Sequence, residues 1–290
     1  QQADAFLARR QFDMVADSWT NPCTDQELDS LGSDECMMRR LTTWIDREPS
    51  RPFFAVVWTG QTHFPYALSR SAPAIAKPNL PSNVGGHSAP DSLAVRFERY
   101  LRALRESDRA TGNVLRHLAQ RGLLDSTLVA VVGDHGEAFG QHGNWAHRYL
   151  YEEEVHIPLL LINHRLFHGE TDDAIGGTID LAPTIMDLLG YPVPGEWQGR
   201  SLFSSDRPGR VYLFGPYSGL FGYREGSQKL IYDAIGDEAE LYDLAADPHE
   251  ALNLAGGHPD VVLRGRERLA AWMQYQNRFY GRVQRTHVRR

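Results

Sequence analysis

The residues best suited to chemistry lie in one short stretch, VVGDHGEAFGQHGNWAH, which spans residues 131–147. Asp134 and His135 directly follow an apolar run and precede a glycine, so we expect a carboxylate and an imidazole on a tight turn at a strand end. Carboxylate oxygen and imidazole nitrogen together suit a divalent ion such as Zn²⁺, Mn²⁺, Mg²⁺ or Ca²⁺. The alternative is that Asp134 caps the turn and His135 is merely exposed, and the spacing alone leaves both interpretations open.

Further histidines are candidates for contact with a substrate. His147 lies twelve residues after His135, and the glycines between them allow the loop to fold back. There His147 could protonate a leaving group or bind an anionic oxygen. His63, in TGQTHFPY, is a second candidate, with the alternative of a strand-end residue hydrogen-bonded to a loop carbonyl. His142 and His156 rank lower, and His156 is expected to be a core histidine because it enters the next apolar run.

Apolar periodicity predicts the elements that position these residues. We expect helices at 34–47, from 97 to about 120 and at 179–190, buried strands at 52–60, 126–134 and 157–163, and a surface loop at 66–92. This order predicts an α/β fold with a mostly parallel sheet flanked by helices. Ligands of such sheets gather beyond the carboxyl ends of the strands, where His63 and Asp134 both fall.

The pattern changes near residue 206. Short alternating runs separated by turn residues predict a small antiparallel sheet, and the segment 258–280 predicts a closing helix. We therefore expect two domains, an α/β core at 1–205 and a small α+β subdomain at 206–290.

Composition narrows the classes of partner. The 290 residues are 42% hydrophobic and 23% charged, as in an ordinary globular protein, and the net charge of −7 has no basic cluster. Nucleic acid is therefore not expected as a partner. No apolar run approaches the roughly 20 residues that span a bilayer. The two cysteines, Cys23 and Cys36, either form a disulfide in an oxidising compartment or remain thiols.

Several motifs in consistent order carry a resemblance to a known family. The segments PFFAVVWTGQTHFPY, LVAVVGDHGEAFGQHG, YEEEVHIPLLL, TIDLAPTIMDLLGYPVPGEWQGRSL and YDLAADPHEALNL, within about residues 50–256, resemble the C-terminal two thirds of the sulfatase branch of the alkaline phosphatase superfamily. That branch includes sulfatases, phosphonate monoester hydrolases, and membrane-linked phosphoethanolamine and phosphoglycerol transferases.

The resemblance implies an alkaline-phosphatase-like fold and metal-dependent transfer of a sulfuryl or phosphoryl group. Asp134 and His135 would supply half of a metal site, and Glu137 would support their loop. His63 and His147 would contact the transferred group or the leaving oxygen, and Lys229 would border the substrate pocket.

The chain also departs from the family pattern. The family carries its first metal-binding acids and its nucleophile in an N-terminal third that is not recognisable here. Cys36 has the spacing to Arg40 of one family nucleophile, but Met replaces the expected small residue or proline and the stretch fits a helix. We therefore expect the nucleophile outside this chain, no turnover by this chain alone, and exposed apolar edges that favour pairing with the absent segment or a second copy.

The leading hypothesis is thus a metal-dependent hydrolase of sulfate or phosphate esters. Two alternatives remain: the catalytic domain of a transferase anchored by upstream membrane helices, and a non-catalytic pseudoenzyme fragment. The expected substrate is a small anionic ester or an ester on a lipid or glycan. An extracytoplasmic location, periplasmic or membrane-anchored, is the expectation for either catalytic class.

Overall fold

The structure is a computed structural model that describes residues 12–16, 33–69, 72–75, 91–215 and 218–287. These residues form two compact units. The first comprises the described residues within Gln1–Ser82, His87–Val129 and Ile162–His168, and the second comprises those within Ala130–Leu161 and Gly169–Arg290. No helix in the described part of the chain has the length and apolar character needed to cross a membrane. The predicted division at 205/206 stays a prediction.

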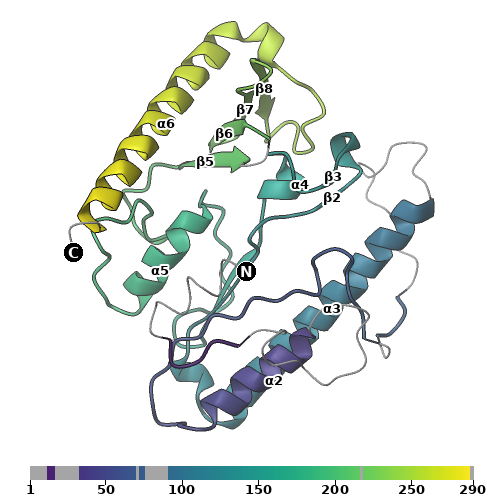
Figure 1. The fold of residues 1–290 in the computed structure, drawn as a ribbon, viewed down its shortest axis with the longest axis vertical. Coiled ribbons are helices and arrows are strands. Elements are labelled where there is room, and N and C mark those ends of the chain that lie inside the picture. Colours follow the sequence, from purple (N-terminus) through teal and green to yellow (C-terminus); the bar gives the residue numbers. More distant parts are fainter. Residues whose placement is uncertain (1–11, 17–32, 70–71, 76–90, 216–217, 288–290) are drawn as a thin grey trace. The chain divides into compact units, whose positions relative to one another are not determined.

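Two helices dominate the first unit, and both were predicted. Helix α2 (Asp34–Ile45) packs against helix α3 (Asp91–Gln120) (Figure 1). The side chain of Ser33 caps α2 by accepting the amide of Cys36. The apolar faces of both helices form a core whose buried members are Met38, Ile45, Ala110, Val114 and Leu118. Cys36 is disulfide-bonded, and the second cysteine of the chain, Cys23, lies outside the described residues.

The segment 52–60 is not the buried strand that its composition predicts. Phe53 and Val57 pack on the α2–α3 core, but Phe54, Val56 and Trp58 are 68%, 71% and 77% exposed. Within the described residues this segment pairs with no other strand, so it lacks the backbone hydrogen bonds that define a β-strand. An apolar run with high β propensity forms a strand only where a neighbour supplies the ladder of hydrogen bonds. The predicted loop at 66–92 lies mostly outside the described residues.

The second unit contains the loop with the opening motif. Strand β1 (Val129–Val132) pairs with β4 (Leu159–Ile162), and both fall within predicted strands. Between them lie β2 (Ala138–Phe139), β3 (Trp145–Ala146) and the short helix α4 (Glu152–Val155). The predicted mostly parallel sheet is not seen in the described ranges, where β1 and β4 form a sheet of two strands. A 3-10 turn at Thr178–Asp180 leads into α5 (Leu181–Leu188), inside the predicted helix at 179–190.

The predicted small antiparallel sheet with a closing helix is confirmed. Its strands are β5 (Arg210–Gly215), β6 (Leu220–Glu225), β7 (Gln228–Asp233) and β8 (Glu238–Asp243), each antiparallel to the next. Helix α6 (Pro259–His287) runs beside this sheet (Figure 1). Leu269 of α6 is buried against Tyr223, Leu230 and Leu241 of the sheet. The other face of the sheet packs Ile231 and Tyr242 against Leu150, which follows the site loop.

Candidate functional site

A two-stranded hairpin brings the two ends of the opening motif together. Strands β2 and β3 are antiparallel, with Ala138 opposite Ala146 and Phe139 opposite Trp145. One step beyond the first pair, this register places Glu137 and His147 side by side. The turn between the strands closes through Gly140, whose amide donates to the carbonyl of Asn144 at 2.9 Å and whose φ of 95° suits glycine.

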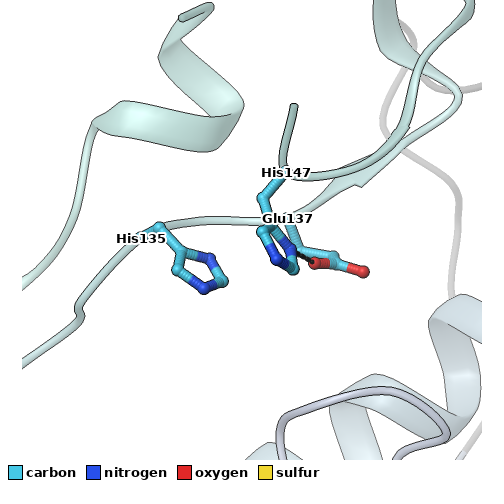
Figure 2. Close-up of side chains that lie close together, drawn as sticks. All are labelled: His135, Glu137 and His147. Carbon is cyan, nitrogen blue, oxygen red and sulfur yellow. Dashed lines mark hydrogen bonds and ion pairs between the residues drawn. The ribbon is translucent and has the colours of Figure 1, made fainter. Parts of the chain in front are cut away.

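Three side chains from this loop converge on one point. His135, Glu137 and His147 each offer one ligand atom within 4.8 Å of the other two, and Figure 2 shows them gathered beside the loop. The imidazoles of His135 and His147 stack with their centroids 3.9 Å apart. Nδ1 of His147 lies 3.0 Å from Oε2 of Glu137, whose side chain is only 12% exposed. The sequence analysis predicted that His135 and His147 lie in one loop, but it did not predict the contact of Glu137 with His147.

Hydrogen bonds assign the tautomers of the two histidines. Nδ1 of His135 lies 2.8 Å from the carbonyl oxygen of Gly136, which can only accept, so Nδ1 carries the proton and Nε2 the lone pair. Nδ1 of His147 faces the Glu137 carboxylate in the same way. A carboxylate behind a histidine fixes the ring and raises the basicity of its other nitrogen. Both Nε2 atoms are therefore suited to bind a cation or to carry a second proton.

Asp134 lies beside this cluster. Its Oδ1 accepts the amide of His135 at 2.9 Å, and its Oδ2 lies 3.7 Å from Nε2 of His135. The side chain is 58% exposed, so its oxygens are accessible from solvent. The imidazole nitrogen of His135 and the carboxylate of Asp134 form a mixed nitrogen and oxygen ligand set, which suits a divalent ion.

His63 belongs to the first unit and lies on a separate turn. Its amide donates to the carbonyl of Gly60 at 3.1 Å, and its carbonyl accepts the amide of Tyr66 at 2.8 Å. Nδ1 of the exposed ring is 2.7 Å from the carbonyl oxygen of Phe64, so the proton sits on Nδ1. The ring is thus held in one tautomer on the surface of its unit.

Buried polar residues that the sequence did not single out hold this turn. Oδ1 of Asp34, which is fully buried, accepts the amide of Gly60 at 2.8 Å. The Gln61 side chain donates to Oε2 of Glu106 at 3.0 Å and accepts the Asp34 amide at 3.0 Å. Burial raises the pKa of Asp34, and hydrogen bonds from Ser107 and from the amides of Gly60 and Gln61 oppose that rise. Asp34 and Glu106 anchor the segment that carries His63 to helices α2 and α3.

Lys229, the predicted substrate contact, lies on β7 with its side chain fully enclosed. Its Nζ is 2.9 Å from Oε1 of Glu152 and 2.8 Å from Oε1 of Glu250. A buried ammonium with two carboxylate partners has its charge satisfied inside the protein. Its role toward substrate stays a prediction.

The two lower-ranked histidines differ in their surroundings. His142 is 18% exposed, stacks on Tyr151 with centroids 3.8 Å apart, and places Nδ1 2.8 Å from Oε1 of Glu153. His156 is not the core histidine that we expected, because its side chain is 70% exposed and lies 3.4 Å from Oε2 of Glu152. The residue precedes β4, and Pro158 separates it from the strand.

Comparison with known proteins identifies the family of the chain. The Sulfatase family model matches residues 2–191. N-acetylglucosamine-6-O-sulfatase of Bacteroides thetaiotaomicron is 33% identical over 176 residues, 54% of this chain and 31% of that protein. Arylsulfatase K of Bos taurus is 26% identical over 189 residues, 59% of this chain and 35% of that protein. The chain therefore spans about a third of the length of these curated relatives.

Solved structures with a similar fold include two members of related enzyme classes. The yidJ protein of Bacteroides fragilis, solved as a candidate sulfatase, superposes with a TM-score of 0.70 at 22% identity, over 85% of this chain and 59% of that one. A phosphonate monoester hydrolase from Silicibacter pomeroyi gives a TM-score of 0.56 at 27% identity, over 65% of this chain and 43% of that one. The fold is alkaline-phosphatase-like, and the chain belongs to the sulfatase family.

Proposed function

We propose that this chain carries part of the active site of a metal-dependent hydrolase that cleaves sulfate esters. The observation that carries the proposal is the convergence of His135, Glu137 and His147, which places a cation-binding nitrogen beside a carboxylate-backed imidazole. Membership of the sulfatase family supports a sulfate ester over other anionic esters.

In this proposal His135 and Asp134 would hold the divalent ion, and the bound ion would stabilise negative charge on the oxygens of the transferred group. His147 acts as the general acid. Its Nδ1 proton stays on the ring, hydrogen-bonded to the Glu137 carboxylate. A second proton on Nε2 passes to the ester oxygen as a nucleophile outside the residues assigned here attacks the sulfur and the bond from sulfur to that oxygen breaks. Glu137 thereby stabilises the imidazolium that donates the proton.

The substrate class proposed is a sulfated sugar. One relative is named for N-acetylglucosamine 6-O-sulfate, and a structure 26% identical to this chain holds D-glucosamine-2-N,6-O-disulfate as its substrate (TM-score 0.54, over 68% of this chain and 44% of that one). The disulfide at Cys36 supports an extracytoplasmic location, because such bonds persist in oxidising compartments.

The test is a panel of substrates assayed with the full-length protein and defined metals. N-acetylglucosamine 6-sulfate, 4-nitrophenyl sulfate and 4-nitrophenyl phenylphosphonate would be compared after EDTA treatment and after restoration of Mn²⁺, Zn²⁺ or Ca²⁺. We expect metal-dependent release of sulfate and a lower kcat/KM for the phosphonate. A preference for the phosphonate would transfer the proposal to the hydrolase class of the Silicibacter structure, and metal-independent or absent turnover would refute it.

A further inference from the structure

A cluster of buried charges lies below the site loop and is not used by the proposed reaction. Lys229 of β7 is 2.9 Å from Glu152 of α4 and 2.8 Å from Glu250, which follows β8. The side chains of Lys229 and Glu250 have no exposed surface, and that of Glu152 is 16% exposed. Three elements distant in sequence therefore meet at one ammonium group.

Glu250 makes a second contact to the same helix. Its Oε2 accepts the backbone amide of Glu152, the first residue of α4, at 2.6 Å. One carboxylate thus pairs with Lys229 through one oxygen and fixes the start of α4 through the other. Glu250 and Lys229 therefore join α4 to the C-terminal sheet, together with Arg224 of β6, whose Nη1 lies 3.3 Å from Oε2 of Glu152.

Helix α4 in turn holds the site loop at its first part. The amide of Gly136 donates to the carbonyl of Glu154 at 2.8 Å. A Cβ atom at Gly136 would lie 2.1 Å from the carbonyl oxygen of Glu153, so the loop and α4 approach as closely as glycine allows. Gly136 lies between His135 and Glu137 in sequence, so this contact fixes the backbone between two members of the cluster.

The hairpin turn is held at a second point through His142. Nδ1 of His142 lies 2.8 Å from Oε1 of Glu153, and Nε2 lies 3.2 Å from the carbonyl oxygen of Glu250. His142 and Glu250 both adopt the left-handed backbone region, with φ of 52° and 53°. Non-glycine residues persist there only where their surroundings fix them, and such strain concentrates at functional sites. Here the two strained residues contact each other.

We infer that Lys229, Glu250 and Glu152 form a positioning clamp for the loop that carries His135, Glu137 and His147. The clamp acts through α4 on Gly136 and through His142 on the hairpin turn. A buried ion pair of this kind contributes little net stability. In this proposal it instead holds α4, β7 and the turn after β8 in one arrangement. The inference rests on the proposed function only in assigning a divalent ion and an acid to the loop.

Lys229→Met and Glu250→Gln test the clamp in the full-length protein. Methionine keeps the length of the lysine stem without its charge. Glutamine keeps the shape of Glu250 and an oxygen for the Glu152 amide but loses the charge that pairs with Lys229. Glu225→Gln is the matched control, because Glu225 pairs with Arg210 and Arg268 at the other side of the same sheet and contacts no residue of α4 in the interactions described.

Two measurements report on the loop independently of catalysis. The first is the affinity for Mn²⁺ by calorimetric titration, and the second is hydrogen exchange of the Gly136 amide, both made where each variant is fully folded. We expect Lys229→Met and Glu250→Gln to weaken Mn²⁺ binding about tenfold or more, the range for partners that orient metal ligands, and to speed exchange at Gly136 by at least tenfold. Glu225→Gln should change both by less than twofold.

The clamp is refuted if the two variants keep the wild-type Mn²⁺ affinity and exchange rate, or if Glu225→Gln weakens binding and speeds exchange as much as they do. If Lys229→Met does not fold, the milder Glu250→Gln decides by the same criteria. A failure of the metal proposal can be told apart from a failure of the clamp. If His135 does not bind the ion, His135→Ala with Lys229, Glu152 and Glu250 intact will leave the Mn²⁺ affinity unchanged. Exchange at Gly136 alone would in that case decide whether the clamp exists.

Discussion

Glu137 and His147 are joined by a 3.0 Å contact because the β2–β3 register places them next to each other beyond Ala138 and Ala146. The backbone pairing of the two strands therefore brings the two side chains together. With Nδ1 against the carboxylate, the Nε2 edge of the imidazole points away from Glu137. An imidazole held in this way keeps the same nitrogen against the carboxylate when it gains or loses a proton at the other nitrogen.

The first prediction concerns His147 as the acid. His147→Ala should lower kcat/KM for sulfated sugars, whose leaving alcohols need a proton, by about 10²–10⁴-fold. For 4-nitrophenyl sulfate the loss should be at least tenfold smaller, because nitrophenolate leaves without protonation. The measurement is kcat/KM over a series of leaving groups. An equal loss across the series would remove the acid role, and Glu225→Gln serves as a control for general destabilisation.

The second prediction concerns Gly136. Gly136→Ala should lower the free energy of unfolding by about 2 kcal/mol or more, because the added Cβ would overlap the carbonyl oxygen of Glu153. Gly256→Ala, where no atom lies within 4 Å of the added carbon, should change it by less than about 0.5 kcal/mol. Urea unfolding of both variants measures the difference. Similar values for the two would mean that α4 moves aside without cost.

The third prediction concerns the pH dependence that His142 confers. Burial alone would lower the pKa of His142, but the hydrogen bond to Glu153 and the charges of Glu153 and Glu250 outweigh it and raise that pKa above 6.5. The folded state thus binds the proton more tightly than the unfolded state. The resulting stabilisation is complete below pH 6.5 and is lost as the pH rises through the folded pKa. His142→Gln should remove this loss, as chemical denaturation between pH 6 and 9 can show, whereas an unchanged slope would contradict it.

The fourth prediction concerns Glu154, whose side chain is buried. Burial raises its pKa from 4.5 to about 7, although the amide of Tyr149 donates to its Oε2 at 2.6 Å. Because the folded pKa is raised, Glu154 favours folding fully below pH 4.5, and this contribution is lost as the pH rises to about 7. The loss is on the order of 3 kcal/mol. Glu154→Gln, which keeps an acceptor for Tyr149, should be more stable than the wild type at pH 8 and equal to it at pH 4. Equal stability at both pH values would contradict the shift.

The sequence singled out His135 and His147, which the structure brings together, but not the contact that holds His147 in place. Asp134, His135 and His147 were recognisable because a strand pattern ran into an acid and histidines within seventeen residues. The partnership of Glu137 with His147 was missed, although both lie at equal distances from the center of a turn that contains Gly140 and Gly143. Symmetry about a glycine-rich turn is the signal that could have found it.

Other features depend on contacts between distant residues. The run at 52–60 reads as a strand by composition, yet strand formation depends on a partner that composition does not name. The family resemblance predicted Lys229 at the substrate pocket, and nothing in the sequence pairs it with Glu152 and Glu250. Glu152 lies 77 residues from Lys229 and 98 residues from Glu250. These side chains are buried because β7, α4 and the turn after β8 pack together, which the sequence alone does not specify.

The position of Glu250 also sets a limit on shortening the protein. The family match ends at residue 191, so a shortened protein would naturally be designed to end near that residue. Removal of the residues beyond it would take away Lys229 and Glu250, leave Glu152 without the ammonium that neutralises it, and release the turn at His142. On the clamp inferred above, the smallest portion that preserves the loop extends past residue 250 and includes the C-terminal sheet.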